Sequence, residues 1–136
     1  MAFIGKKSEE RSKPDRMGQT TKRVGDAAEE LALQYLQEQG LRLLVRNYRT
    51  PGRGGGEIDL IMRAPDATLV FVEVRSRKNS KYGGALASIS LTKQRRIVFA
   101  AQHYLLRWSK MPPCRFDVLA LEGQSLNWYK GAFGQG

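Results

Sequence analysis

Apolar residues recur at three- and four-residue steps in two segments of the chain, and each segment predicts an amphipathic helix. The first helix is expected at residues 21–39. The second is expected to begin at Ser90 or Thr92, either of which can cap a helix, and to end near Trp108. The expected buried stripe of the first helix consists of Val24, Ala28, Leu31, Tyr35 and Leu36. That of the second consists of Ile97, Ala100, Ala101, Tyr104, Leu105 and Trp108.

Short runs rich in apolar and β-branched residues predict the strands. They are expected at residues 41–48, on either side of a turn at 64–67, at 115–121 and, as a short addition, at 125–129. The two strands joined by the turn should pair antiparallel, and the long helical connection that follows favours a parallel crossover to the next strand. The sequence therefore predicts an α/β fold with a mixed β-sheet flanked by helices, in the order helix, strand, strand, strand, helix, strand.

Length and composition indicate one globular domain. A chain of 136 residues with 41% hydrophobic residues can form a single core. Residues 1–20 lack periodicity and predict a mobile basic tail, so the single domain is expected at 21–136. No apolar run approaches the roughly 20 residues of a membrane span, and the first residues contain no continuous apolar signal core. We therefore expect a cytoplasmic protein that has no membrane partner.

The charge balance is strongly basic, with 23 lysines and arginines against 13 acidic residues and a formal net charge of +10. Such a bias favours a polyanionic partner, and nucleic acid is the commonest polyanion in a cytoplasm. A basic surface with no specific partner is the alternative. The single cysteine and the single histidine exclude an internal disulfide and a structural zinc site made of these residues.

Charged residues occur inside the two strands on either side of the turn, where an ordinary core strand would avoid them. Glu57 and Asp59 are two apart on the first strand, and Glu73 and Arg75 are two apart on the second. Side chains two apart on a strand point to the same face, so each strand offers one charged pair. Asp59 and Glu73 could together bind a divalent metal such as Mg²⁺, which prefers oxygen ligands. The alternative is a set of salt bridges in which arginines neutralise these acids.

Two further groups of charged residues bear on this hypothesis. Glu29 lies beside the stripe of the first helix, so its side chain either points toward the sheet or is an ordinary surface acid. Cations in the first turn of the second helix oppose the helix dipole, which indicates either a bound anion or a solvated basic face. The residues expected to bind the backbone of a nucleic acid are Arg53, Arg77, Lys78, Lys81 and Lys93.

Several of these motifs, in this order, resemble the YraN-like family of small, largely uncharacterised bacterial proteins. More distantly, the acidic strands resemble the D…E-x-K core of the restriction-endonuclease-like nucleases. The match covers about residues 22–130. The residues that carry it are Gly25-Asp26-Ala27-Ala28-Glu29, Arg46-Asn47-Tyr48, Gly56-Glu57-Ile58-Asp59-Leu60-Ile61, Phe71-Val72-Glu73-Val74-Arg75-Ser76-Arg77, Lys93 and Arg115-Phe116-Asp117-Val118.

This resemblance implies a restriction-endonuclease-like fold similar to that of archaeal Holliday-junction resolvases, and it implies roles by position. Asp59 and Glu73 match metal ligands for Mg²⁺ or Mn²⁺, and Glu29 matches the acid that the first helix brings to the metal. Arg75 stands where such nucleases usually have a lysine. Glu57 is expected to be a supporting residue. The catalytic set implied in this way is Glu29, Asp59, Glu73 and Arg75.

The arginine at position 75 leaves two functions open. Arginine keeps its proton in proteins, so it cannot act as a general base, although it can stabilise developing negative charge. The leading hypothesis is a Mg²⁺-dependent, endonuclease-like protein that acts on DNA in preference to RNA, with branched DNA as the more specific expectation. The alternative is a catalytically inactive nucleic-acid-binding module of the same fold. Symmetric cleavage of a four-way junction would also require a homodimer, since it needs two active sites.

Overall fold

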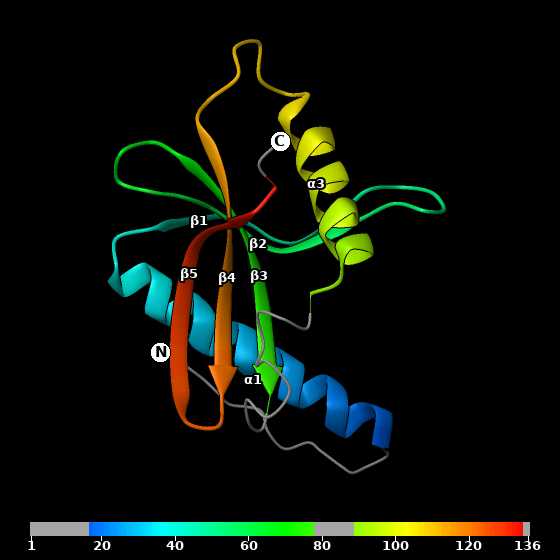
Figure 1. Cartoon of the computed structure of the whole chain (residues 1–136), viewed down its shortest axis with the longest axis vertical. Helices are drawn as coiled ribbons and strands as arrows, with labels where there is room; N and C mark the ends of the chain where they lie inside the picture. The colour runs from blue at the N-terminus through cyan, green and yellow to red at the C-terminus, as the bar shows by residue number, and fades with distance from the viewer. Residues whose placement is uncertain (1–16, 78–88, 135–136) are drawn as a thin grey trace.

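The computed structural model describes residues 17–77 and 89–134, with side chains from residue 25 onward. The elements follow the order helix, three strands, helix, two strands, as the sequence predicts (Figure 1). They are α1 (Met17–Glu38), β1 (Arg42–Arg49), β2 (Glu57–Arg63), β3 (Leu69–Arg77), α3 (Leu91–Leu105), β4 (Cys114–Glu122) and β5 (Ser125–Phe133). Helix α1 begins at Met17, earlier than expected, so it includes the end of the predicted tail. The rest of that tail, 1–16, lies outside the described residues.

The strands form one mixed sheet in the order β1-β2-β3-β4-β5. The hairpin β2–β3 is antiparallel and β4 lies parallel to β3, as the sequence predicts. Strands β1 and β5 complete the two edges in antiparallel pairing. The parallel pair is the reason that β3 and β4 need a connection carrying α3, because parallel neighbours cannot be joined by a tight turn. This is the mixed sheet with two helices that is expected of an α/β nuclease-like core.

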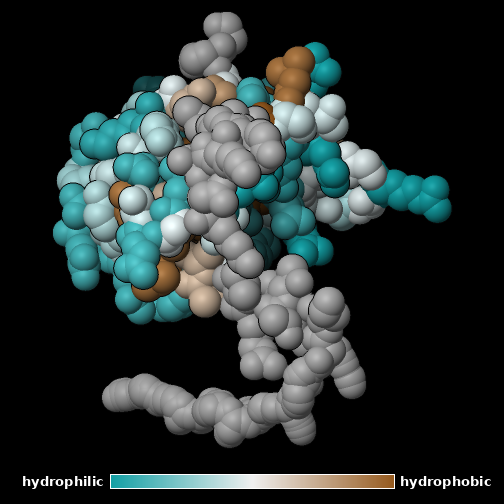
Figure 2. Space-filling view, turned by 60° about the horizontal axis from the view of Figure 1, so that its bottom comes forward, coloured by the Kyte–Doolittle hydropathy of each residue, from teal (hydrophilic) through white to brown (hydrophobic). Residues whose placement is uncertain are grey.

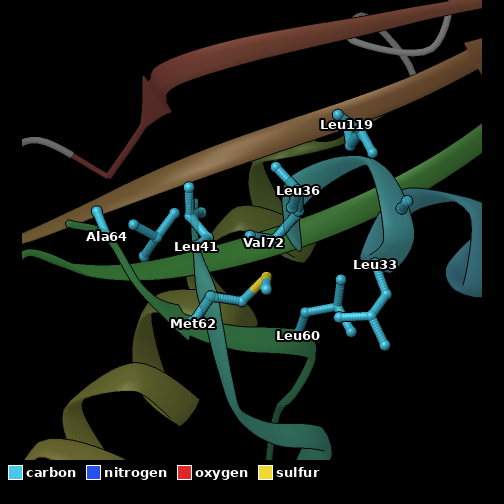
Figure 3. Packing of buried hydrophobic residues seen from close by; sticks show 10 residues of the cluster. Leu33, Leu36, Leu41, Leu60, Met62, Ala64, Val72 and Leu119 are labelled. Carbon is cyan, nitrogen blue, oxygen red and sulfur yellow. The ribbon is translucent and has the colours of Figure 1, made fainter. Parts of the chain in front are cut away.

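Two hydrophobic clusters lie on opposite faces of the sheet. Alternate residues of β3 belong to different clusters, because successive side chains of a strand point to opposite faces. Val70 and Val72 join the cluster beneath α1, whereas Leu69 and Phe71 join the cluster beneath α3. Figure 3 shows the first cluster, in which side chains of α1 meet those of β2, β3 and β4. Each helix is therefore held by its own face of the sheet.

Helix α1 packs through a stripe that is rotated from the predicted one. The prediction that Leu31 is buried is wrong, since 53% of it is exposed. Ala28 and Leu36 are buried as predicted, and Ala32 and Leu33 face the sheet in place of Leu31. This rotation matters for the site, because Glu29 lies one helical turn before Leu33 and shares its side of the helix.

Helix α3 follows its prediction closely. Ser90 is the N-cap, and its Oγ accepts a hydrogen bond from the backbone N–H of Lys93 at 3.0 Å. This contact satisfies one of the free donors of the first turn, so it fixes where the helix begins. The predicted stripe faces the sheet, with Ile97, Ala100, Ala101 and Tyr104 buried.

The surface in one view of the molecule is more polar than these two buried clusters. The face shown in Figure 2 is mainly hydrophilic over its described part, and apolar side chains occur on it singly. No helix in the described part of the chain is long and apolar enough to cross a membrane.

Candidate functional site

The predicted acids meet where β2 separates from β3. The paired register runs from Arg63↔Leu69 to Leu60↔Val72 and ends there. Asp59 and Glu73 occupy the next position of that register, so they face each other at the point where the strands part. Ile58 packs on the α3 side and Leu60 on the α1 side, which shows that the regular alternation of β2 breaks at Asp59.

The side chain of Asp59 takes the place of a backbone hydrogen-bond acceptor at the point where β2 and β3 separate. Its Oδ2 accepts a hydrogen bond from the backbone N–H of Val74 at 2.8 Å, an N–H that the ladder with β2 no longer satisfies. The side chain is only 9% exposed. Burial raises the pKa of Asp59, while the Val74 hydrogen bond and the nearby Lys93 ammonium partly oppose that shift. The carboxyl is thus fixed in direction by the backbone of the neighbouring strand.

Glu73 is the more deeply buried of the two acids, at 3% exposure. Burial and the repulsion of Asp59 raise the pKa of Glu73 to about 8, although Lys93 and Arg75 act in the opposite direction. Within the described part of the chain, its Oε1 is buried and has no hydrogen-bond partner. Two buried carboxyls that face each other need a shared proton or a cation between them. In the absence of a metal, the proton remains on this pair at neutral pH.

Two cations from different elements approach the same oxygen of Glu73. Nη1 of Arg75, two residues along β3, lies 3.5 Å from Glu73 Oε2. Nζ of Lys93, from the first turn of α3, lies 3.7 Å from that oxygen. Arg75 therefore shares a face with Glu73, as the spacing predicts. Lys93 was predicted only as a contact to a nucleic-acid backbone, and the structure brings it into the acidic site. The nearby acid Glu73 also explains why a lysine occurs in the first turn of α3, where the helix dipole disfavours a cation.

Glu29 approaches Asp59 from α1. Its carboxyl is half-buried, and burial and the charge of Asp59 raise its pKa, whereas Arg46 and a hydrogen bond from the Asn47 side chain lower it. The partial burial of Glu29 and its interaction with Asp59 favour the sheet-facing alternative. No three histidine, cysteine, aspartate or glutamate side chains of the described residues cluster closely enough to hold a metal. The contacting acids are thus the pair Asp59 and Glu73, with Glu29 beside them.

The structure describes three of the five remaining predicted residues. Glu57 forms an ion pair with Arg49 at 3.8 Å between Oε1 and Nη2, so the salt-bridge alternative describes this acid. Arg53 lies exposed in the loop between β1 and β2, and Arg77 lies exposed at the end of β3. Lys78 and Lys81 lie outside the described residues.

The glycine-rich loop before β2 is held against α3. Gly55 O accepts two hydrogen bonds from the Arg96 guanidinium, each at 3.2 Å. A Cβ added to Gly56 would stand 1.9 Å from the Arg96 carbonyl oxygen, so only glycine fits at this approach. The backbone N–H of Gly56 donates to Thr50 Oγ1 at 2.8 Å, which closes the loop. These contacts fix the start of the strand that carries Asp59.

The arrangement suits a hard divalent cation. Mg²⁺ is usually held by one or two carboxylates and completes its coordination with water. Asp59 and Glu73 supply the carboxylates, and a cation between them would take the place of the proton that they share. The fit depends on the loss of the shared proton, since a carboxyl must be ionised to serve as a ligand.

Two residues of the site were not predicted in these positions. Asn47, which lowers the pKa of Glu29, was noted only as part of a motif. The contact of Lys93 with Glu73 joins residues that are far apart in the sequence. Its only sequence signal was its unfavourable place in the first turn of a helix.

Comparison with known proteins places the chain in a family. The profile described as "Uncharacterised protein family UPF0102" matches residues 28–121, which include the whole acidic site. A UPF0102 protein of Albidiferax ferrireducens is 69% identical over 114 residues, which is 84% of this chain and 89% of the relative. A UPF0102 protein of Acidovorax sp. (strain JS42) is 62% identical over 133 residues, 98% of each chain. One of Paracidovorax citrulli is 64% identical over 117 residues, 86% of this chain and 87% of the relative. The chain therefore belongs to the uncharacterised protein family UPF0102, the YraN-like family that its motifs resemble.

Proposed function

We propose that this protein is a metal-dependent phosphodiesterase that cleaves DNA, with branched DNA as its preferred substrate. One observation carries the proposal: two buried carboxyls, Asp59 and Glu73, face each other where two strands separate, and two cations stand beside them. An α/β scaffold supports many activities, so the argument rests on this site and not on the fold.

The buried acid pair is unfavourable for the fold alone. Strongly shifted pKa values produced by burial and a like charge are typical of functional sites. A purely structural ion pair would keep both acids ionised, yet the pKa of Glu73 is raised to about 8, so the pair holds a proton at neutral pH. A cation that takes the place of this proton would let both carboxylates ionise, which supports a role in which a cation binds during function.

Hydrolysis of a phosphodiester requires water to attack phosphorus while the bond to the leaving oxygen breaks, which yields a phosphate monoester and a hydroxyl. A divalent cation bound there would supply positive charge to the phosphate and activate the water. Asp59 and Glu73 are the residues that would hold it, and the Val74 N–H keeps Asp59 aimed at the site. Arg75 and Lys93, which lie beside Glu73, would stabilise the negative charge that develops on the phosphate oxygens. Arg75 acts here as a fixed charge, because arginine does not give up its proton.

The basic surface supports DNA as the substrate. The net charge of +10 favours a polyanion, and Arg53, in the loop before β2, and Arg77, at the end of β3, are exposed. Contacts of this kind go to phosphates, which position a duplex without reading its sequence. Recognition of shape, as in branched DNA, is therefore the expected mode.

Purified protein incubated with duplex, flap and four-way-junction DNA tests the proposal, with Mg²⁺ or Mn²⁺ and with EDTA. Cleavage is expected only with the metal. Asp59→Asn and Glu73→Gln should abolish it, since each removes one carboxylate. Asp66→Asn is the matched control, because Asp66 is exposed in the turn between β2 and β3.

The outcomes separate the functions. Cleavage that survives Asp59→Asn comes from a contaminant and refutes the proposal. Salt-sensitive DNA binding without cleavage identifies the non-catalytic module instead. Symmetric cutting of a junction requires a homodimer, so sedimentation that shows only monomer with and without DNA would exclude a resolvase.

A further inference from the structure

We infer that Arg42 and Arg63 form an anion site that binds a phosphate group, at the end of the β1–β2 pair that lies away from the acidic site. The inference goes beyond the proposed function, because it concerns binding alone and requires neither a metal nor cleavage. Arg63 ends β2, four residues after Asp59, which corresponds to about 13 Å along an extended strand.

The two ends of the β1–β2 pair carry opposite arrangements of charge. At one end Arg49 faces Glu57, and their side chains form an ion pair with 3.8 Å between Nη2 and Oε1. At the other end Arg42 faces Arg63. Residues directly opposite each other in an antiparallel pair project from the same face with Cβ atoms about 5 Å apart, so two arginines in these positions repel each other. The strand pairing alone would favour an acid at one of them.

Neither arginine forms an ion pair within the described part of the chain. Other arginines of the sheet do have such partners. On β1 itself, Nη1 of Arg46 lies 3.1 Å from Glu30 Oε1. Asp66, three residues after Arg63, is engaged within its own turn, where its Oδ1 accepts a hydrogen bond from the backbone N–H of Thr68 at 3.0 Å. No described side chain therefore compensates the charge of the Arg42–Arg63 pair.

The guanidinium group of Arg63 also has an unused donor. Its Nε is buried and has no hydrogen-bond partner among the described residues. Arginine keeps its proton in proteins, so loss of a proton cannot relieve this N–H. A buried donor that lacks an acceptor is unfavourable for the fold. An oxyanion bound here would supply both the acceptor and the missing negative charge.

Both arginines line a hollow in the surface. Its volume is about 230 Å³, whereas one water molecule occupies about 30 Å³ in the liquid, so an oxyanion fits together with water. Arginine presents its N–H groups in a planar fork that matches the oxygens of a phosphate group. That group can belong to a nucleic-acid backbone or to free phosphate. The residues that line the hollow include no acid and are Gly40, Arg42, Arg63, Ala64, Pro65 and Ala67.

Inorganic phosphate tests the site directly, in EDTA and against chloride at equal ionic strength. We expect phosphate to shift the ¹H–¹⁵N signal of the Arg63 Nε–H group and to raise the midpoint of thermal unfolding of the wild type. Arg42→Gln and Arg63→Gln should each weaken phosphate binding by about 10-fold or more, because each removes a charged donor. In chloride, Arg42→Gln should not lower the midpoint, since it relieves the repulsion. Arg49→Gln is the matched control at the other end of β1 and should bind phosphate as the wild type does.

Duplex DNA separates the two sources of the phosphate group. If a nucleic-acid backbone occupies the site, the double variant Arg42→Gln/Arg63→Gln should weaken DNA binding and reduce the slope of log K against log salt by about 1. Unchanged DNA binding together with the loss of phosphate binding would identify free phosphate or a small phosphate ester as the ligand. Equal phosphate binding by the wild type and the double variant would overturn the inference, and so would an Arg63 Nε–H signal that phosphate leaves unshifted. All of these measurements are made without a metal, so failure of the proposed cleavage leaves their outcome intact.

Discussion

Replacing Glu73 by glutamine removes the ionisable carboxyl from the centre of the site while it keeps the shape of the side chain. Glu73 is almost fully buried and faces Asp59, and one of its oxygens has no partner among the described residues. The two cations beside it, Arg75 and Lys93, are each about a third exposed, at 31% and 33%. They retain water when the carboxylate is removed. The substitution is therefore expected to stabilise the fold at neutral and higher pH.

The magnitude follows from the pKa of Glu73, which burial and then Asp59 raise from 4.5 to about 8. The folded protein binds this proton more tightly than the unfolded chain does. The stabilisation that the proton provides is therefore complete below pH 4.5 and is lost as the pH rises through about 8. Each pKa unit corresponds to about 1.4 kcal/mol, so the wild type loses about 3 kcal/mol by about pH 7 and about 5 kcal/mol above about pH 8. Glutamine does not ionise and avoids this loss.

Urea unfolding in EDTA buffers from about pH 5 to about pH 8.5 measures the effect. The free energies of unfolding of Glu73→Gln and wild type should agree near pH 5 and diverge with increasing pH, with the variant the more stable. Glu57→Gln is the control. Its carboxylate is 42% exposed and forms an exposed ion pair, which is worth at most about 1 kcal/mol, so its effect should stay small at every pH.

Two results would refute this reasoning. One is a variant that is less stable than the wild type at about pH 8, and the other is a difference that does not change with pH. Added Mg²⁺ provides an independent check, because a metal that binds only the folded state raises its stability. Mg²⁺ should stabilise the wild type near pH 8 and leave Glu73→Gln unchanged.

Three further predictions concern other parts of the molecule. Asp117→Ala should lower the free energy of unfolding by about 3–5 kcal/mol in urea, because this fully buried carboxylate accepts hydrogen bonds from Arg115, Trp128 Nε1 and the backbone N–H of Gly131. Gly56→Ala should destabilise by about 1–3 kcal/mol through its clash with a carbonyl of α3, whereas Gly25→Ala, with nothing near its Cβ in α1, should stabilise by about 0.5–1 kcal/mol. Arg53→Ala should weaken DNA binding uniformly across sequences and reduce the slope of log K against log salt by about 1 in a fluorescence titration.

Most of the secondary structure could be predicted from local patterns. Alternation and periodicity depend on which side of an element is buried, so they identify the hairpin β2–β3, the helix α3 and its cap at Ser90. The same reasoning failed at Leu31, because several apolar residues of α1 could have formed the buried stripe. Only the packing of α1 on the sheet decides which set is buried, and that set includes Ala32.

The candidate site was likewise predictable only in part. The sequence by itself determined that Asp59 and Glu73 lie on neighbouring antiparallel strands, since a short turn joins those strands and the spacing sets the register. It also determined the pairing of Glu73 with Arg75, because side chains two apart on a strand share a face. These are consequences of local geometry, and the chain alone contains them.

Only the tertiary structure decided which other residues join the acids. Lys93 reaches Glu73 because the first turn of α3 lies beside that residue of β3. The separation of β2 from β3 at Asp59 is likewise a property of the assembled sheet. Local patterns record whether a residue is buried, but the identity of its neighbours depends on how distant elements pack together. For that reason the pair of acids could be predicted, and the lysine that joins them from α3 could not.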